Sequence, residues 1–292
     1  MATVLIIGSG PAGIAASLYL KRGGADVMVV SRGSGALGKA EKIQNYYGLA
    51  EAVTGKTLEA DGIAGAKSIG VRFILDEVVS LSMNEDFTGF ITKTPHGAYA
   101  SDAVVLAAGS SRQTLPLPGI KELEGKGVSY CAMCDAFFYR GKKVGVLGSG
   151  EYALHEAEIL LPHAAGVTLF TNGGEPSVQI PKEIRLNKEK LLSIEAGDEK
   201  KRIRGIRLSS GQEVSLDGLF VALGVAGSVD FARKIGAAVE GGNILVNKDM
   251  ATNVPGLFAA GDCTGGLYQI VKAAYEGTVA GLSVLRYLKA KK

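Results

Sequence analysis

The chain has 292 residues, of which 47% are hydrophobic and 21% charged, and its formal net charge is +3. This composition is typical of a folded globular protein of about two domains, and it excludes both a largely disordered chain and a disulfide-dense secreted scaffold. The charge is too small to indicate nucleic-acid binding, and the chain has neither a tryptophan nor an alternation of aromatic and basic residues that would stack on bases.

The first element in chain order is an apolar run over residues 4–20, which three glycines and a proline interrupt. No basic region precedes it, so the run predicts a strand, a turn and a helix. It argues against both a signal peptide and a membrane span. The absence of a targeting segment predicts a cytoplasmic protein with no membrane partner.

The turn reads Gly8-Ser-Gly10-Pro-Ala-Gly13, and a second strand is predicted over 26–30. In a dinucleotide-binding βαβ unit, the first glycine permits the tight turn and the second lets a pyrophosphate approach the backbone. The third lets helix and strand pack closely, and the helix N-terminus faces the phosphate. Ser31-Arg32 stands where NAD-binding units usually carry an acid.

A buried strand is predicted over 102–109, and the Pro-x-Pro-Gly segment at 116–119 indicates that the chain then leaves the first domain. Further on, strands over 143–147 and 166–170 enclose a helix over 154–161. This is the same strand, glycine turn, helix and strand order as at the N-terminus. The repeat predicts an α/β protein with two dinucleotide-binding units.

Cys131-Ala-Met-Cys134-Asp135 opens the second domain, and the chain has only one other cysteine. In a reducing compartment a C-x-x-C pair favours redox or metal chemistry. Zinc requires two further ligands, and the three histidines form no suitable pair. A redox-active dithiol is favoured over two inert buried thiols, because exchange needs a thiolate and a second thiol that resolves the mixed disulfide. Asp135 is a candidate acid for the leaving thiol.

The second glycine turn reads Gly148-x-Gly150-x-x-Ala153. Recognition of NAD expects an acid after the next strand, and recognition of NADP an arginine. The segment there begins Thr171-Asn-Gly-Gly, and no lysine or arginine lies between residues 164 and 181. The second unit therefore has nucleotide-binding architecture without a visible means of holding NADPH.

The remaining segments complete the two domains. The run 182–207 holds nine Lys/Arg against five Asp/Glu and is interpreted as a solvated strand-and-turn surface. Strands are predicted over 216–224 and 256–262 and a long helix over 268–289, while Cys263 is interpreted as a small packed residue. The stretch 236–242 is a plausible return to the first domain. The predicted domains are 1–113 with 240–292, and 114–239.

Taken together, the motifs resemble the low-molecular-weight flavoprotein thioredoxin reductase family. The G-S-G-P-A-G turn, Cys131-x-x-Cys134-Asp135, the second G-x-G-x-x-A turn and Ala259-Ala-Gly-Asp262 occur in that family's order. The resemblance implies two Rossmann-like (FAD/NAD(P)-binding) domains of the two-dinucleotide-binding-domain flavoprotein type, with FAD on the first. It implies an oxidoreductase acting on a protein disulfide, with thioredoxin as its partner and a homodimer as its assembly.

The same resemblance implies residue roles. Cys134 would face the flavin, Cys131 would attack the protein substrate, and Asp135 would be the acid–base. Asp262 would meet the ribityl chain, and the stretch 268–270 would run along the flavin ring. The implied FAD-binding residues are Gly8, Gly10, Ala12, Gly13, Ser31, Arg32, Asn45, Val78, Gly109, Gly261, Asp262, Gln269 and Ile270.

Several departures from that family concern the electron donor. The basic H-R-R-x-x-x-R segment that receives the 2′-phosphate of NADPH is missing, and Thr171-Asn-Gly-Gly stands in its place. Tyr152 in the second turn either occupies space that a nicotinamide nucleotide needs or is simply packed. These departures resemble the ferredoxin-dependent flavin thioredoxin reductases, in which reduced ferredoxin supplies single electrons that the flavin collects in pairs.

Other functions stay open from the sequence. One is a conventional NADPH-dependent thioredoxin reductase in which an arginine such as Arg185 reaches the 2′-phosphate. A second is a dithiol oxidase that passes electrons to oxygen, and a third is a non-catalytic, redox-sensing flavin protein. If the family mechanism holds, the two domains must move, with hinges near 113–119 and 236–242.

Overall fold

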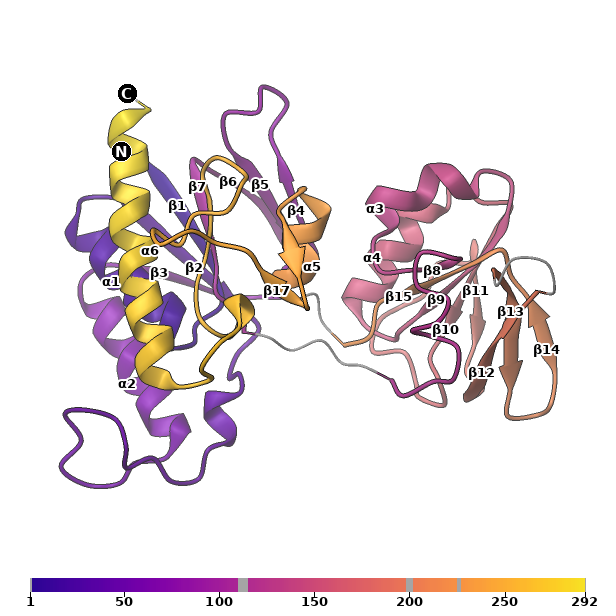
Figure 1. Cartoon of the computed structure of the whole chain (residues 1–292), viewed down its shortest axis with the longest axis horizontal. Coiled ribbons are helices and arrows are strands. Elements are labelled where there is room, and N and C mark those ends of the chain that lie inside the picture. The colour runs from indigo at the N-terminus through magenta and orange to yellow at the C-terminus, as the bar shows by residue number, and fades with distance from the viewer. Residues whose placement is uncertain (1, 110–114, 198–201, 225–226, 292) are drawn as a thin grey trace. The chain divides into compact units, whose positions relative to one another are not determined.

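The computed structural model describes residues 2–109, 115–197, 202–224 and 227–291 (Figure 1). The chain divides into two compact units, Met1–Ser111 with Gly227–Lys292, and Arg112–Ala226. The predicted boundary at 113/114 lies outside the described residues.

The return to the first unit comes earlier than the predicted boundary at 239/240. Helix α5 (Ser228–Lys234) packs against the first unit, and the Ser228 hydroxyl accepts a hydrogen bond from the Ala108 N–H at 2.9 Å. The stretch 236–242 is therefore part of the first unit. It leads into a hairpin of β16 (Val239–Glu240) and β17 (Asn243–Ile244), and it does not cross between the units.

The first unit is built on a five-stranded parallel sheet in the order β18-β7-β1-β2-β3. Figure 1 shows α1, α2 and α6 on one side of this sheet and an antiparallel sheet, β4-β5-β6, on the other. The strands are β1 (Thr3–Ile7), β2 (Asp26–Ser31), β3 (Arg72–Leu75), β4 (Ser80–Met83), β5 (Phe90–Thr94), β6 (Gly97–Ser101), β7 (Ala103–Leu106) and β18 (Leu257–Ala259). The helices are α1 (Pro11–Arg22), α2 (Gly55–Ser68) and α6 (Ile270–Ala290), with short 3₁₀ turns η1 (Leu37–Lys39) and η3 (Asp262–Thr264).

The core of this unit lies between the parallel sheet and its helices. Strand residues such as Val4, Val29 and Val105 are fully buried there, as both faces of a parallel sheet usually are. Helices α1 and α6 approach closely because Gly277 has no side chain: a Cβ at that position would lie 2.0 Å from the Ala12 carbonyl oxygen.

The second unit repeats this plan, with a five-stranded parallel sheet in the order β11-β10-β9-β15-β8 and an antiparallel sheet β12-β13-β14. The α/β class predicted from the sequence is thereby confirmed. The strands are β8 (Val128–Ser129), β9 (Lys143–Leu147), β10 (Gly166–Phe170), β11 (Ile184–Asn187), β12 (Leu191–Ala196), β13 (Ile203–Leu208), β14 (Glu213–Ser215) and β15 (Gly218–Val221). The helical segments are α3 (Ala132–Asp135), η2 (Ala136–Tyr139) and α4 (Glu151–Leu160).

In a parallel sheet all strands end at the same edge, which is where open α/β folds bind ligands. In the first unit this edge carries Gly8, Gly109 and Gly261, each within three residues of the end of a strand. In the second unit, the edge strand β8 leads into Cys131. No helix in the described ranges is both long enough and apolar enough to span a bilayer.

Candidate active site

The first glycine turn has the geometry that pyrophosphate binding requires. Gly8 has a φ of +113°, and a Cβ there would lie 2.4 Å from the Ala107 carbonyl oxygen. A Cβ at Gly13 would lie 2.0 Å from the Gly8 carbonyl oxygen, whereas a Cβ at Gly10 would have nothing within 4 Å. Gly10 caps α1 in an extended conformation with no side-chain hydrogen bond. The helix N-terminus is therefore open to an anionic ligand.

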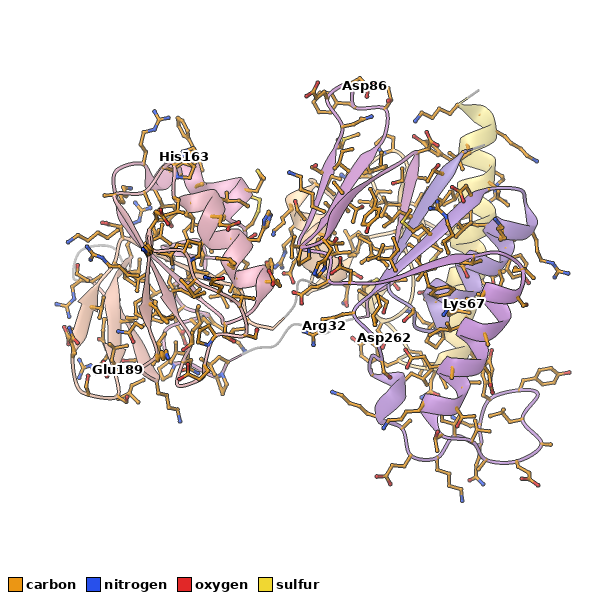
Figure 2. All side chains as sticks on the ribbon, turned by 180° about the vertical axis from the view of Figure 1, so that it is seen from behind. Arg32, Lys67, Asp86, His163, Glu189 and Asp262 are labelled. Carbon is orange, nitrogen blue, oxygen red and sulfur yellow. A yellow bond between two sulfur atoms is a disulfide. The ribbon has the colours of Figure 1, made fainter. Side chains whose placement is uncertain are left out.

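The end of β2 carries hydroxyl groups where an acid is common. Ser9 Oγ donates a hydrogen bond to Ser31 Oγ at 2.8 Å, and Ser31 in turn donates to the Gly33 carbonyl at 3.1 Å. Arg32 is largely exposed and its guanidinium lies 3.5 Å from a Glu77 carboxylate oxygen. Figure 2 labels Arg32 and Asp262, which both follow strands of the same sheet. Val78 is buried, and Gly109 has a φ of +74° with open space where a Cβ would be.

Two residues that the sequence analysis missed hold the Gly261–Asp262 turn. Lys272 Nζ donates to the carbonyl oxygens of Gly261 (2.8 Å) and Gly265 (2.6 Å). The same ammonium lies 3.0 Å from Glu276 Oε2, which accepts the Gly261 N–H at 2.8 Å. Both side chains are mostly buried, at 15% and 12% exposed. The i,i+4 Lys–Glu spacing at the start of the last helix is the signal that could have revealed them.

Two residues that are far apart in the sequence, Asn45 and Gln269, are hydrogen-bonded to each other. Asn45 Nδ2 donates to Gln269 Oε1 at 3.3 Å, and Ile270 begins α6 immediately afterwards. Ala12, in the first turn of α1, is buried, and its methyl group would lie 3.0 Å from a Cβ at Gly261. The tertiary structure thus brings together several of the residues that the resemblance implies for FAD.

In the second unit, Cys131 and Cys134 form a disulfide at the start of α3. Cys131 is buried and Cys134 is exposed. Cys131 Sγ accepts a hydrogen bond from the Cys134 N–H at 3.1 Å. Three large apolar side chains next to the pair are exposed to more than half of their surface, namely Met133, Phe137 and Phe138.

Asp135 is held by a residue that the sequence analysis did not single out. Ser129 Oγ donates to Asp135 Oδ2 at 2.7 Å and accepts the Cys131 N–H at 3.2 Å. Below the same turn, the buried Glu156 on α4 accepts the Ala132 N–H at 2.7 Å. No sequence motif marks either contact, because both depend on how β8 and α4 are placed around the turn.

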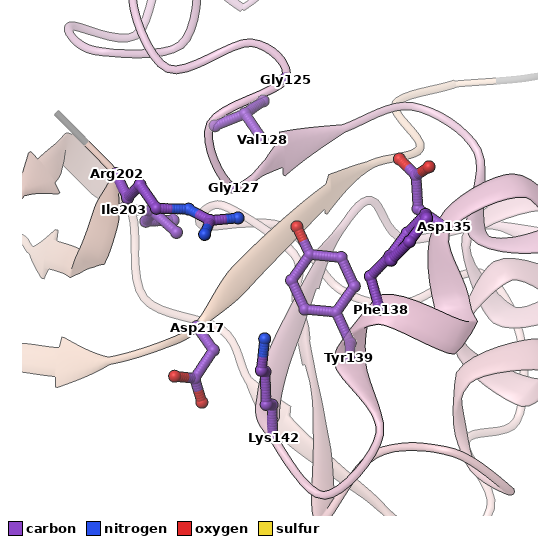
Figure 3. A pocket seen from close by; sticks show the side chains of 10 residues that line it. All are labelled: Gly125, Gly127, Val128, Asp135, Phe138, Tyr139, Lys142, Arg202, Ile203 and Asp217. Atoms are coloured by element: carbon purple, nitrogen blue, oxygen red, sulfur yellow. The ribbon is translucent and has the colours of Figure 1, made fainter. Parts of the chain in front are cut away.

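A cavity of about 570 Å³ opens beside Asp135 (Figure 3). Its walls carry the Tyr139 phenol, the cations Lys142 and Arg202, and a second carboxylate, Asp217. Burial raises the pKa of the Tyr139 phenol, and the nearby Asp135 carboxylate raises it further. The acid predicted for the dithiol lies on the wall of a cavity lined by charged side chains.

The second glycine turn differs from the first at its middle glycine. The Ser177 N–H and hydroxyl both bond to the Ser149 carbonyl, at 2.8 and 3.2 Å. A Cβ at Gly150 would consequently lie 3.5 Å from Ser177 Oγ, where the first turn has open space at Gly10. The loop after β10 therefore lies in contact with the second glycine turn beside Gly150.

Hydrogen bonds and an ion pair fix the conformation of that loop. The Thr171 hydroxyl donates to the Gly174 carbonyl at 2.5 Å, and Asn172 Oδ1 accepts the Leu191 N–H at 2.8 Å. Glu175 pairs with Lys188 at 2.5 Å. The segment itself contributes no cation, and Lys188, which reaches it from the turn after β11, is paired with Glu175.

Tyr152 is a packed residue. Its side chain is 2% exposed, and its hydroxyl donates to the Tyr130 carbonyl at 3.4 Å. Of the two interpretations left open by the sequence, the packed one agrees with this contact.

The basic run 182–207 is partly neutralised on the β12-β13-β14 sheet. Arg207 pairs with Glu195 and Glu213, and Arg204 also pairs with Glu213. Two of its nine cations, Lys200 and Lys201, lie outside the described residues. The paired cations fit the solvated surface expected from the sequence.

Cys263 is fully buried, and burial raises the pKa of its thiol to about 12. Its Sγ donates to the Ala260 and Leu106 carbonyls. It is a packed thiol, as predicted. Across the described residues, no three His, Cys, Asp or Glu side chains gather in a way that would hold a metal ion.

Comparisons with known proteins agree with this architecture. Residues 2–277 match the family model described as pyridine nucleotide-disulphide oxidoreductase. The thioredoxin reductase of Aquifex aeolicus is 34% identical, with 99% of this chain and 94% of the relative covered. That of Coxiella burnetii is 32% identical, with 98% and 96% covered.

Two solved structures are similar over nearly their whole length. One is the atypical thioredoxin reductase TRi from Desulfovibrio vulgaris Hildenborough, with a TM-score of 0.92, 36% identity and 99% of both chains covered. The other is a ferredoxin-flavin thioredoxin reductase from Clostridium acetobutylicum, with a TM-score of 0.73, 33% identity and 99% and 98% covered.

Proposed function

Since the chain belongs to the pyridine nucleotide-disulphide oxidoreductase family, we propose that it is a thioredoxin reductase that receives its electrons from reduced ferredoxin rather than from NADPH. It is an oxidoreductase acting on a disulfide, and the family's cofactor is FAD. Bound FAD supplies a carrier that can take up electrons singly and deliver them in pairs.

The first unit supplies the residues that would hold this cofactor. The open helix end at Gly10 fits the pyrophosphate, and Gly8 and Gly13 set the turn that exposes it. Lys272 and Glu276 hold the Gly261–Asp262 turn, which would meet the ribityl chain. Asn45 and Gln269 would meet the flavin side by side.

The second unit supplies the dithiol. In the reduced enzyme, the Cys131 thiolate attacks one sulfur of the substrate disulfide and the other leaves. Cys134 then attacks the Cys131 sulfur of the mixed disulfide, which restores the Cys131–Cys134 disulfide and releases the substrate dithiol. Two electrons and two protons pass to the substrate, and Asp135 gives a proton to a leaving thiolate.

The contacts around the disulfide support these roles. The Cys134 N–H bonded to Cys131 Sγ favours a thiolate at Cys131. Cys131 is buried in the disulfide form, so the turn must open when the substrate docks. Exposed Met133, Phe137 and Phe138 beside the pair suit a protein substrate with an apolar surface.

The choice of ferredoxin rests on one observation, the loop that is bonded to the second glycine turn and carries no basic residue. Ser177 bonds to Ser149 beside Gly150, the segment after β10 contains no lysine or arginine, and Lys188, which reaches it, is paired with Glu175. Arg185, the candidate from elsewhere, is in register with Thr168, three residues or about 10 Å before Thr171 at the end of β10. The likeness to a solved ferredoxin-flavin thioredoxin reductase supports the same choice.

The test is an anaerobic titration of the bound flavin, followed by its absorbance. NADPH, NADH and then reduced ferredoxin are added in turn, each at a concentration that would sustain turnover. We expect only ferredoxin to bleach the flavin, and thioredoxin to reoxidise it over many turnovers. Prompt bleaching by NADPH would instead assign the conventional reductase.

The same assay separates the other two functions. Rapid release of hydrogen peroxide from oxygen and a small dithiol would favour a dithiol oxidase. A single turnover with thioredoxin, without a second, would favour a redox sensor.

We also infer that two copies of the chain associate through α6. Val271, Tyr275 and Leu282 are 57%, 64% and 42% exposed and lie along one side of that helix. A stripe of exposed apolar side chains of this kind is typical of an interface between copies. Its test is given with the predictions below.

A further inference from the structure

We propose that Ser129 is a positioning residue that holds Asp135 at the redox turn, so that the acid can protonate the thiolate leaving the protein substrate. This inference deepens the proposed function and rests on it. Its observation is the pair of hydrogen bonds that Ser129 Oγ makes, to Asp135 Oδ2 at 2.7 Å and from the Cys131 N–H at 3.2 Å.

Ser129 is itself fixed by the sheet. It is the last residue of β8, in register with Phe220 of β15, and it is 7% exposed. A hydroxyl has one proton to give and two lone pairs to receive, so both bonds form at once without competing. The serine therefore ties the Asp135 carboxylate to the backbone of the attacking cysteine.

The Asp135 side chain needs a hydrogen bond that fixes its orientation, for two reasons. It ends a helix of four residues, α3, which is too short to hold a side chain in place by itself. It also lines the cavity that contains Lys142 and Arg202, and these cations offer the carboxylate alternative partners away from the disulfide (Figure 3). The Ser129 hydroxyl favours the orientation toward the redox turn.

The proton balance assigns the serine no chemical change. When the substrate disulfide opens, the proton moves from Asp135 to the departing sulfur, which becomes a thiol. Asp135 is left as a carboxylate and keeps the hydrogen bond from Ser129, which retains its own proton. The acid is then reprotonated from water in the adjoining cavity.

The test compares substrates that differ in their need for an acid. Enzyme reduced with a stoichiometric amount of dithionite, with no excess left, is mixed in a single turnover with thioredoxin disulfide, with hydroxyethyl disulfide or with the aromatic disulfide DTNB. The aromatic thiolate is a good leaving group and needs no proton, whereas the aliphatic thiolates do. Because the enzyme is reduced beforehand, the result does not depend on the natural electron donor.

For Ser129→Ala we expect the saturating single-turnover rate constant to fall about tenfold with both aliphatic disulfides, the size expected for losing one hydrogen bond to a charged group. The substrate concentration at half-saturation and the rate constant with DTNB should be unchanged. Ser129→Thr, which keeps a hydroxyl, should restore the rate. Ser101→Ala, an equally buried serine at the end of β6, is the matched control.

A double-mutant cycle with Asp135→Asn decides whether Ser129 acts on the rate through Asp135. If Ser129 acts through Asp135, Ser129→Ala costs nothing further in the Asp135→Asn background. An equal loss in both backgrounds, or an equal loss with DTNB, would overturn the proposal. Melting temperatures identify any variant that fails to fold, and in that case the Thr variant carries the comparison.

The two hypotheses can fail separately. If the unmodified enzyme reduces hydroxyethyl disulfide but not thioredoxin, the substrate assignment fails while the role of Ser129 is still decided by the variants.

Discussion

Asn45 and Gln269 stand 224 residues apart in the chain, yet the amide of one donates a hydrogen bond of 3.3 Å to the other. Each was implied as a flavin contact on separate grounds. An exposed hydrogen bond contributes about 1 kcal/mol or less to stability. We therefore expect Asn45→Ala and Gln269→Ala to change the melting temperature little and to weaken FAD retention. The double variant should lose no more than either single one, measured as flavin per chain after dialysis. Strictly additive losses would show that the two side chains act apart.

The second and third glycines of the first turn, Gly10 and Gly13, should respond differently to alanine. Gly10→Ala meets open space, so the protein without cofactor should lose about 1 kcal/mol of stability or less, while the methyl group blocks the pyrophosphate. Gly13→Ala places a methyl group 2.0 Å from a carbonyl oxygen and should cost about 3 kcal/mol or more. Thermal unfolding of flavin-free protein and flavin content together check this. Full flavin binding by Gly10→Ala would remove that site from the cofactor.

Lys272→Met removes the ammonium that bridges Gly261, Gly265 and Glu276. The partly buried Glu276 carboxylate is left without that cation, so we expect a loss of about 3 kcal/mol and faster FAD dissociation. Lys289→Met, at the exposed end of the same helix, is the control and should change neither. If the flavin dissociates from Lys272→Met as slowly as from the unmodified protein, the contacts of Lys272 with Gly261, Gly265 and Glu276 do not support cofactor binding.

Cys263 should not react in the native protein. Its pKa of about 12 leaves almost no thiolate at pH 8, and burial denies access to reagents. The reduced protein should therefore show two thiols toward iodoacetamide when folded and a third only after unfolding, as mass spectrometry would count them. Cys263→Ala should keep both flavin and turnover. Three reactive thiols in the folded protein would contradict the buried assignment.

Tyr275→Glu tests the proposed association through α6. A charge in the middle of the apolar stripe should convert a dimer into a monomer in sedimentation velocity, with the flavin still bound. Lys289→Glu, beyond the stripe, serves as the comparison. A dimer that withstands Tyr275→Glu would place the interface elsewhere, and a monomeric unmodified protein would dismiss the inference altogether.

Much of the architecture could be predicted from local patterns. The strands 166–170 and 143–147 were placed at their observed bounds, because apolar runs bounded by glycines have few alternatives. The two antiparallel sheets, β4-β5-β6 and β12-β13-β14, were not resolved as sheets. Their strands are short and half-exposed, and their pairing depends on contacts distant in sequence.

The point at which the chain returns to the first unit was also not predictable from local patterns. Gly236, Gly241 and Gly242 favour a turn, and the sequence analysis interpreted that turn as the crossing. They shape the approach to a hairpin and its turn within the first unit, since α5 already packs there. A glycine in the sequence predicts a turn of the backbone, but it does not predict which elements the turn connects.

Local sequence patterns were enough to predict the two glycine turns, the C-x-x-C pair with its neighbouring acid and the order in which they follow one another. These are local properties, because steric limits on the backbone and the spacing of two thiols act within a few residues. The packing of distant segments was needed to show that Ser177 contacts the turn at Gly150 while Gly10 stays open, that Ser129 holds Asp135, and that Lys272 and Glu276 hold the turn at Gly261. Those contacts join side chains that the folding of separate strands and helices brings within hydrogen-bonding distance, and no local pattern encodes such a meeting.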